Sequence, residues 1–362
     1  MKITVEQSIL IAGLTKVQSA VSSRPTIPVL SNILFVAEDG ILKLTATDLE
    51  VSISTSIEAE VTTPGKTTLP AKKFIQFIRQ FPSDKITIDT DENHVSKISC
   101  QGIKHVENGL SDAEFPSEND IADARSFTFE SMKLKKMMDK ISYSVSNDET
   151  RLVLNGIFLS IRQGTLTAVA TDGRRMALME SLIDSEEDTD GDTILPSKAV
   201  SELAKVLSAD GNVTVQLGDV YASFEVGNTK LQTKLIEGTY PNYRQVIPAS
   251  FSQQIAIPRE KFNTALQCVS PQLTETSSAV KIAMTAAEIV VSATSNSGTS
   301  SAPVGVSYDG EETAISFNPT FIMDPLRKLE NDEVILKFND KISPIGLYGD
   351  EGFLYIIMPM RN

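Results

Sequence analysis

The stretch NILFVAEDGILKLTATDLEVSI at residues 32–53 recurs as NGIFLSIRQGTLTAVATDGRRMAL at 155–178 and as AVKIAMTAAEIVVSATSNSGTSSAPVGV at 279–306. Each copy has an alternating apolar run, a polar turn, a second alternating run, and then Ala-Thr before a polar break. Alternation with a period of two is typical of half-buried strands. The near-constant spacing of the three copies is far longer than a solenoid repeat, so it predicts one domain that occurs three times.

Helical patterns flank these strands in the same order in every copy. A proline followed by an amphipathic pattern occurs at 69–81, 195–207 and 317–329, a strand pattern follows at 85–91, 212–219 and 333–340, and a helical pattern opens each copy at 5–21, 131–145 and 258–269. Proline is tolerated near a first helical turn, whereas Pro325 should kink or shorten the last helix. The sequence therefore predicts the α+β class: three repeated domains (1–122, 123–249 and 250–362), each with two helices packed on antiparallel sheets.

Composition limits the class of protein further. The 362 residues, 41% hydrophobic, suffice for several packed cores. The two cysteines, Cys100 and Cys268, are read as reduced thiols of a cytosolic chain rather than as a disulfide framework. The first residues do not show the pattern of a signal peptide, and no apolar run is long enough to predict a membrane span.

The net charge of −14 at first argues against nucleic acid, because phosphate-binding surfaces are basic. Net charge does not say where the charges lie, however. The six expected helices carry an excess of Lys and Arg, concentrated at 71–80 and 131–143, so the acidity belongs to the strands and loops. The net charge alone therefore does not exclude a nucleic-acid partner.

No motif predicts catalysis, a metal or a cofactor. The Gly65-Lys66-Thr67 segment lacks the earlier glycine of a phosphate loop, since Glu60 stands there, and we expect a turn. The acidic run at 188–192 lacks calcium-loop spacing and is read as a solvated loop. His94 and His105 have no second ligand at zinc spacing. The alternatives left open are an enzyme on a repeated scaffold and a protein-interaction module of three repeated domains without DNA.

Several further motifs keep one order and spacing over the whole chain: RPTIPVL (24–30), TDLE (47–50), LPAKKF (69–74), ATDGRR (170–175), YPNY (240–243) and MPMR (358–361). In these residues the chain resembles the bacterial sliding-clamp family, the beta subunit of DNA polymerase III. The resemblance implies a non-enzymatic, cytoplasmic clamp, two copies of which associate head to tail as a closed ring around double-stranded DNA. It also implies the replicative DNA polymerase, the clamp loader and repair polymerases as partners.

The resemblance implies three sets of site residues. The DNA-facing set is Arg24, Lys72, Lys73, Asp148, Leu152 and Val153, to which repeat symmetry adds Lys198. The partner-peptide groove comprises Leu154, Thr171, Gly173, Arg174, Arg175, Met176, Pro241, Val246, Ile356, Met358, Pro359, Met360 and Arg361. The dimer edges are placed at Lys104, His105, Val106 and Glu107 and at Pro271, Gln272 and Leu273. Arg174 and Gln245 depart from the family pattern, which should shift the preferred peptide motif without abolishing binding.

Overall fold

The computed structural model describes residues 1–22, 25, 27–121, 124–183, 189–207, 211–274 and 278–360. Each expected helix is present in these ranges: α1 (Gln7–Val17), α2 (Ala71–Gln80), α3 (Ser131–Ile141), α4 (Ser197–Val206), α5 (Arg259–Val269) and α6 (Pro319–Leu326). Pro325 lies inside α6, which has 8 residues against 10 in α2 and α4, so the predicted shortening is confirmed.

Four antiparallel sheets contain the strands. The 5-stranded sheet has, in spatial order, β5 (Glu60–Thr63), β1 (Lys2–Glu6), β7 (Lys85–Thr90), β8 (Val95–Cys100) and β9 (Ile103–Asn108). One 8-stranded sheet has β10 (Arg125–Glu130), β15 (Asn212–Leu217), β16 (Tyr221–Val226), β17 (Thr229–Lys234), β4 (Val51–Glu58), β3 (Ile41–Thr47), β2 (Asn32–Glu38) and β6 (Gly65–Pro70). The other has β14 (Gly191–Pro196), β11 (Gly156–Arg162), β12 (Thr165–Thr171), β13 (Arg175–Leu182), β25 (Phe353–Ile357), β24 (Ile345–Tyr348), β23 (Glu333–Phe338) and β18 (Gln253–Pro258). The 4-stranded sheet has β21 (Gly298–Gly305), β20 (Glu288–Ser295), β19 (Val280–Met284) and β22 (Thr313–Phe317).

Both 8-stranded sheets run across the borders of the sequence repeats. In one, β4 of the first repeat pairs with β17 of the second; in the other, β13 of the second repeat pairs with β25 of the third. The chain accordingly forms two compact units, one chiefly of residues 1–135 and 198–236 and the other chiefly of 136–183, 190–197 and 237–362. The middle repeat thus contributes strands to both units.

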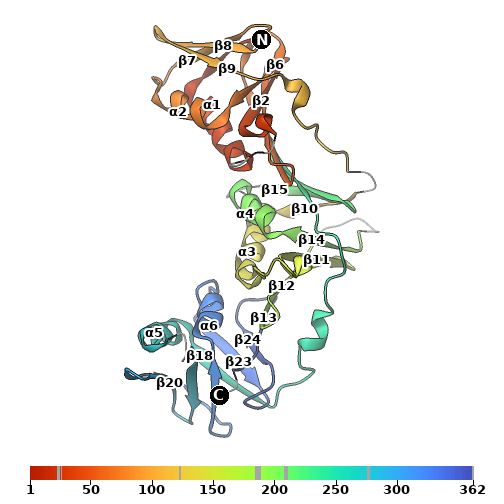
Figure 1. Cartoon of the computed structure of the whole chain (residues 1–362). Coiled ribbons are helices and arrows are strands. Elements are labelled where there is room, and N and C mark those ends of the chain that lie inside the picture. The colour runs from red at the N-terminus through yellow and green to blue at the C-terminus, as the bar shows by residue number, and fades with distance from the viewer. Residues whose placement is uncertain are drawn as a thin grey trace. The chain divides into compact units, whose positions relative to one another are not determined.

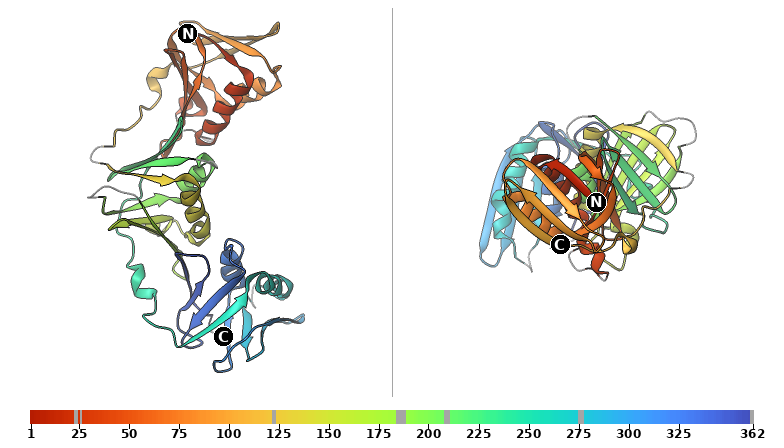
Figure 2. Two further views of the ribbon diagram at one scale, coloured as in Figure 1. Left: turned by 180° about the vertical axis from the view of Figure 1, so that it is seen from behind. Right: turned by 90° about the horizontal axis from the view of Figure 1, so that it is seen from above.

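Within each unit the helices lie against sheet faces, and α1 and α2 lie side by side, as α5 and α6 do (Figures 1 and 2). Helix α2 shows why. Its residues Phe74, Ile75 and Ile78 are buried on one face, while Lys72 and Lys73 are exposed on the other. The ring of Phe74 meets Phe35 of β2 edge-on at 5.4 Å. Apolar burial on one face therefore leaves the cationic face of α2 free.

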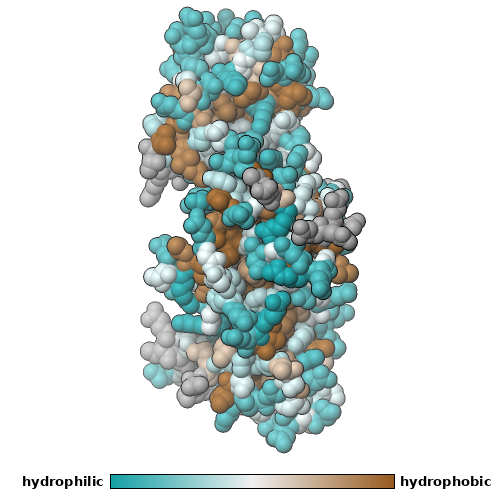
Figure 3. Space-filling model, turned by 90° about the vertical axis from the view of Figure 1, so that its right-hand side faces the viewer, coloured by the Kyte–Doolittle hydropathy of each residue, from teal (hydrophilic) through white to brown (hydrophobic). Residues whose placement is uncertain are grey.

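The structure corrects one expectation about the Gly65-Lys66-Thr67 segment. It is the start of strand β6, and the chain turns just before it at Pro64. On the face shown in Figure 3, hydrophilic side chains cover most of the surface and apolar ones form small separate groups. Among the described helices, none combines the length and apolar character that crossing a membrane requires.

Candidate functional site

The turn from β12 to β13 is the centre of the expected peptide groove. The Asp172 carboxylate accepts bonds from the backbone N–H groups of Arg174 (2.9 Å) and Arg175 (3.0 Å). The Thr171 hydroxyl donates to the Arg175 carbonyl at 2.6 Å and accepts from the Gly173 N–H at 3.1 Å. Gly173 has a φ of +86°, which favours glycine. The hairpin turn predicted for this segment is confirmed, and it leaves Arg174 exposed.

Arg175 is held by several partners. Its guanidinium donates to Asp172 at 3.0 Å, to Asp324 of α6 at 2.6 Å and to the Tyr143 carbonyl at 2.7 Å, and it lies 4.4 Å from the centre of the Phe321 ring. Burial, the largest single influence, lowers the pKa of Arg175, but the bond with Asp324, the neighbouring Tyr355 and the charge of Asp172 together outweigh it and raise that pKa. Arg175 therefore fixes the turn to α6 rather than offering a free cation.

Strand β25 forms the second side of the same place. Ile356 pairs with Met176, and both side chains are buried. Beyond the strand, the N–H of Met358 donates to the Arg174 carbonyl at 3.0 Å and that of Met360 to the Ser316 carbonyl at 2.8 Å. The Met358 side chain is 42% exposed, while Pro359 and Met360 are half-buried. The chain thus provides a buried apolar floor and an exposed methionine beside the turn. Arg361 lies outside the described residues.

The third side is made by the 3₁₀ turn at Leu152–Leu154 and the segment that contains Gly238 and Tyr240. Gly238 and Gly173 both approach this region closely: a Cβ on Gly238 would lie 2.8 Å from Val153, and a Cβ on Gly173 would lie 3.0 Å from the Arg151 guanidinium. Residues 151–153 therefore lie between the β12–β13 turn and the segment that contains Gly238. Tyr240 stacks on Phe158 at 4.7 Å. The buried member of this side is Leu154, and the exposed members are Pro241 and Val246. Of the expected groove residues, all but Arg361 therefore lie on four segments: the β12–β13 hairpin, the end of β25, the Leu152–Leu154 turn and the segment from Gly238 to Val246.

The residues expected to face DNA have different environments. Lys72 and Lys73 are exposed in the first turn of α2, and no described carboxylate forms an ion pair with either. Lys198 instead binds Asp48 (2.5 Å) and Glu50 (2.9 Å), so part of its charge is neutralised. Asp148 binds Arg151 at 2.9 Å. Leu152 is 64% exposed and Val153 is half-buried, whereas Arg24 lies outside the described residues.

The residues expected near the dimer edges lie in two kinds of local structure. Lys104, His105, Val106 and Glu107 lie on β9, a free edge of the 5-stranded sheet, as expected. Pro271 and Gln272 belong to a 3₁₀ turn (Ser270–Gln272) that Leu273 follows, and the free edge in that region is β21. The side-chain amide of Gln272 donates to Ser295 at 2.7 Å and to the Gly298 carbonyl at 3.0 Å. The turn therefore supports the first residue of the edge strand without being part of it.

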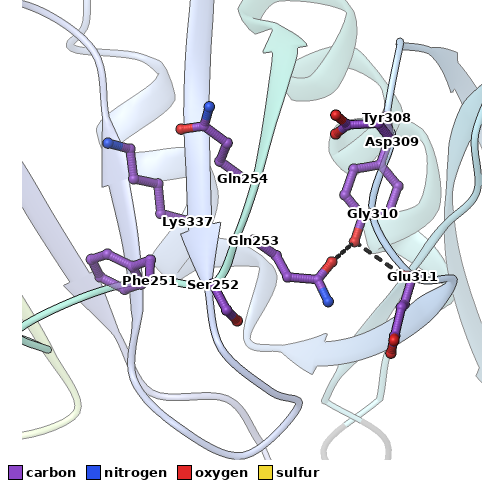
Figure 4. A pocket seen from close by; sticks show the side chains of 9 residues that line it. All are labelled: Phe251, Ser252, Gln253, Gln254, Tyr308, Asp309, Gly310, Glu311 and Lys337. Atoms are coloured by element: carbon purple, nitrogen blue, oxygen red, sulfur yellow. Dashed lines mark hydrogen bonds between the residues drawn. The ribbon is translucent and has the colours of Figure 1, made fainter.

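A separate polar cavity of about 690 Å³ lies beside β18 (Figure 4). Its lining residues are Phe251, Ser252, Gln253, Gln254, Tyr308, Asp309, Gly310, Glu311 and Lys337. The Tyr308 hydroxyl lies within hydrogen-bond distance of two acceptors, the Gln253 side-chain oxygen and the Glu311 carbonyl. Lys337 lies on the far side of Gln253 from that hydroxyl. The described residues contain no cluster of carboxylate, His and Cys side chains suited to a metal ion.

Sequence reasoning missed the ion pairs that support these sites. Lys140 of α3 binds Asp350 between β24 and β25, and Asp324 binds Arg175. A usable signal was the repeat itself, because Lys16 and Lys140 are both the tenth residues of 11-residue helices that open a repeat. Their partners, far along the chain, follow no motif.

Known protein families match all three repeats of the chain. Residues 1–119, 128–242 and 244–361 match the N-terminal, central and C-terminal domains described as DNA polymerase III beta subunit. A protein named beta sliding clamp from Chlamydia muridarum is 33% identical over 362 residues, covering 100% of this chain and 99% of its own length.

Two solved structures are similar over 100% of this chain. A DNA polymerase sliding clamp from Bacillus subtilis has a TM-score of 0.97 at 27% identity, with 99% of that chain covered. A sliding clamp from Bartonella birtlesii bound to griselimycin has a TM-score of 0.94 at 29% identity, with 100% of that chain covered. From all three repeats together, the chain belongs to the bacterial beta sliding clamp family, the beta subunit of DNA polymerase III.

Proposed function

We propose that this DNA sliding clamp closes as a head-to-tail dimer around duplex DNA and tethers polymerases to it. The observation that carries the proposal is the match of all three repeats, over the whole chain, to the beta subunit family. A closed ring needs no tight grip on DNA, because topology retains it while a bound polymerase gains effective concentration at the primer end. Its place of action would be the cytoplasm, at the replication fork.

The partner site in this proposal is the groove formed by the β12–β13 turn, the end of β25 and the Leu152–Leu154 turn. Its buried floor of Leu154, Met176 and Ile356 and its exposed Met358 suit the apolar anchors of a short linear motif. Arg174, exposed beside them, would favour an acidic residue next to the anchor. The replicative polymerase, the clamp loader and repair polymerases would bring such motifs. Arg361 would extend this edge.

The DNA-facing surface would be the helices. Helix α2 has Lys72, Lys73 and Arg79 without an acid, and α3 has Lys133, Lys135 and Lys136 against Asp139. The fourth lysine of α3, Lys140, is buried in its pair with Asp350 and does not belong to this surface. Exposed cations that read no base sequence permit sliding. Lys72 and Lys73 support this role better than Lys198, which binds two carboxylates. Asp148 and Leu152, with Val153, would contribute little attraction for phosphate.

The subunit contact would pair β9 of one copy with β21 of the other, since both are free edges. A head-to-tail contact is heterologous and closes when its rotation permits a ring. Lys104 and Val106 would then lie within the contact, and the Pro271–Leu273 segment would lie beside it through Gln272.

The test is retention on DNA. Clamp loaded onto a nicked circle should remain during gel filtration and should be lost after the circle is cut with a restriction enzyme. Equal retention on circular and linear DNA would contradict encirclement. A variant that lacks residues 358–362 should still be retained by the circle but should no longer bind a polymerase-derived motif peptide. Unchanged peptide affinity would remove Met358, Pro359 and Met360 from the site.

A further inference from the structure

Met358 differs from the other methionines of the chain in its exposure to solvent. All ten methionines lie in the described ranges, and Met358, at 42%, is the one whose side chain is exposed. The buried ones are Met137, Met138, Met176, Met284 and Met323, and the half-buried ones are Met1, Met132, Met179 and Met360. A thioether has no proton to lose, so access to the oxidant governs how fast its sulfur is oxidised. Met358 should therefore react first with a small dissolved oxidant.

The backbone holds Met358 at the peptide groove. Strand β25 ends at Ile357, yet the N–H of Met358 still donates to the Arg174 carbonyl at 3.0 Å, so the pairing with the β12–β13 hairpin continues one residue past the strand. Side chains alternate between the two faces of a strand. Met358 therefore lies on the same face as Ile356, which forms the groove floor together with Met176.

The other methionines of this region are better protected. Met176, in the floor itself, is only 2% exposed. Met360 is half-buried, and its N–H is held by the Ser316 carbonyl at 2.8 Å. Met179 is half-buried and, three residues after Met176 on β13, lies on the opposite face of the sheet. Oxidation that follows exposure would thus select the methionine that the apolar anchor of a partner would touch.

We infer that Met358 is an oxidation site through which hydrogen peroxide switches off the binding of partner peptides. The inference rests on the proposed peptide groove. The sulfur lone pair attacks one oxygen of the peroxide, the O–O bond breaks and an S–O bond forms, while the second oxygen leaves with both protons as water. The sulfur is oxidised by two electrons and the peroxide is reduced by two. The product, methionine sulfoxide, has a polar S–O group where the thioether was apolar.

The sulfoxide oxygen would oppose an apolar anchor in the groove. Covering a polar group without giving it a hydrogen-bond partner is unfavourable, and the measured cost in proteins corresponds to a loss of about five- to hundred-fold in affinity. Met358 belongs to neither β9 nor β21, the free sheet edges, so its oxidation should leave the ring closed. Peroxide would thereby release polymerases from a clamp that stays on DNA, and reduction of the sulfoxide would allow them to bind again.

The test measures the affinity of the full chain for a methionine-free, polymerase-derived motif peptide by fluorescence anisotropy, before and after hydrogen peroxide. Peptide mass spectrometry follows oxidation at each methionine. Every protein in the series carries Cys268→Ser, because that exposed thiol also reacts with peroxide. Met358 should be oxidised first, and the Kd should rise by about five-fold or more in step with it. Treatment with both methionine sulfoxide reductases, one for each sulfoxide epimer, should restore the affinity.

Three variants isolate the site. Met358→Leu has no sulfur to oxidise, so peroxide should not change its Kd, whatever the starting value. Met358→Gln carries a polar group permanently and should bind weakly without peroxide. The matched control Met179→Leu removes a half-buried methionine from the opposite face, and peroxide should weaken its binding as it does without that substitution.

Two kinds of failure are distinguishable. Oxidation of Met358 without a change in Kd, an equal loss of affinity in Met358→Leu, or faster oxidation of the half-buried methionines would overturn the inference and leave the groove in place. Absence of peptide binding before any peroxide is added would overturn the groove and the inference together.

Discussion

Replacing Lys140 by Met should loosen the second unit where α3 meets the β24–β25 connection. The Lys140 and Asp350 side chains are only 9% and 11% exposed. Asp350 also accepts the backbone N–H groups of Glu330 and Asn331, each at 3.0 Å. Burial opposes its charge, but Lys140 and these amides outweigh the cost and lower the pKa of Asp350. The carboxylate is thus the centre of a small buried network.

Removing one partner of a buried ion pair costs about 3–5 kcal/mol, because the other charge is left without compensation. Two amide donors remain on Asp350 after Lys140→Met, so we expect the lower end, about 3 kcal/mol. Lys136→Met is the control: its pair with Glu330 is 50% and 59% exposed and should contribute about 1 kcal/mol or less.

Native-state hydrogen exchange measures the effect locally. The opening free energy of amides at 328–331 and 353–357 should fall in Lys140→Met and scarcely change in Lys136→Met. The double variant Lys140→Met/Asp350→Asn should be less destabilised than the two single losses added together, with a coupling of about 2–3 kcal/mol. Additive losses, or a loss below about 1 kcal/mol in Lys140→Met, would refute the buried-network reasoning.

Three further predictions concern local structure. Leu49→Gly should stabilise the first unit by up to about 1 kcal/mol in urea unfolding. Leu49 is 51% exposed and has a φ of +78°, a conformation that costs a non-glycine residue about 1–2 kcal/mol. A loss of stability would contradict this reasoning. Tyr355→Phe should cost about 1 kcal/mol by thermal unfolding, because the hydroxyl of the buried Tyr355 donates to the Phe321 carbonyl at 2.6 Å; an unchanged Tm would show that this bond contributes nothing. The pKa of Asp350 is lower in the folded chain than its unfolded value of about 3.9, so the ionised Asp350 contributes its full stabilisation above pH 3.9 and loses it as the pH falls through the folded pKa. Asp350→Asn should therefore flatten the acid side of the plot of unfolding free energy against pH, and an unaltered plot would count against this.

The repeat explains why so much of the fold was predictable. Three copies of one pattern place each helix within a few residues, and the turn at Thr171–Arg175 follows from Asp172 and Gly173 alone. The groove residues were placed by resemblance, and the described ones lie on segments that meet. The ion pairs between repeats could not be predicted, because Asp324 and Asp350 belong to no sequence motif and meet their partners only in the folded chain. The 3₁₀ turn at Pro271 was missed for a related reason: the edge strand that it supports begins 27 residues later.

The strand pairing across repeats also bears on biosynthesis. Strand β4 leaves the ribosome with one edge unpaired, and its neighbour β17 follows roughly 170 residues later. At about 5–20 residues per second, that edge waits about 10–35 s. Strand β13 waits a similar time for β25. Several nascent chains on one messenger RNA would therefore expose an unpaired β4 edge at the same time. The order of translation, more than the stability of the finished fold, would then decide whether β4 pairs with β17 of its own chain or of a neighbouring chain.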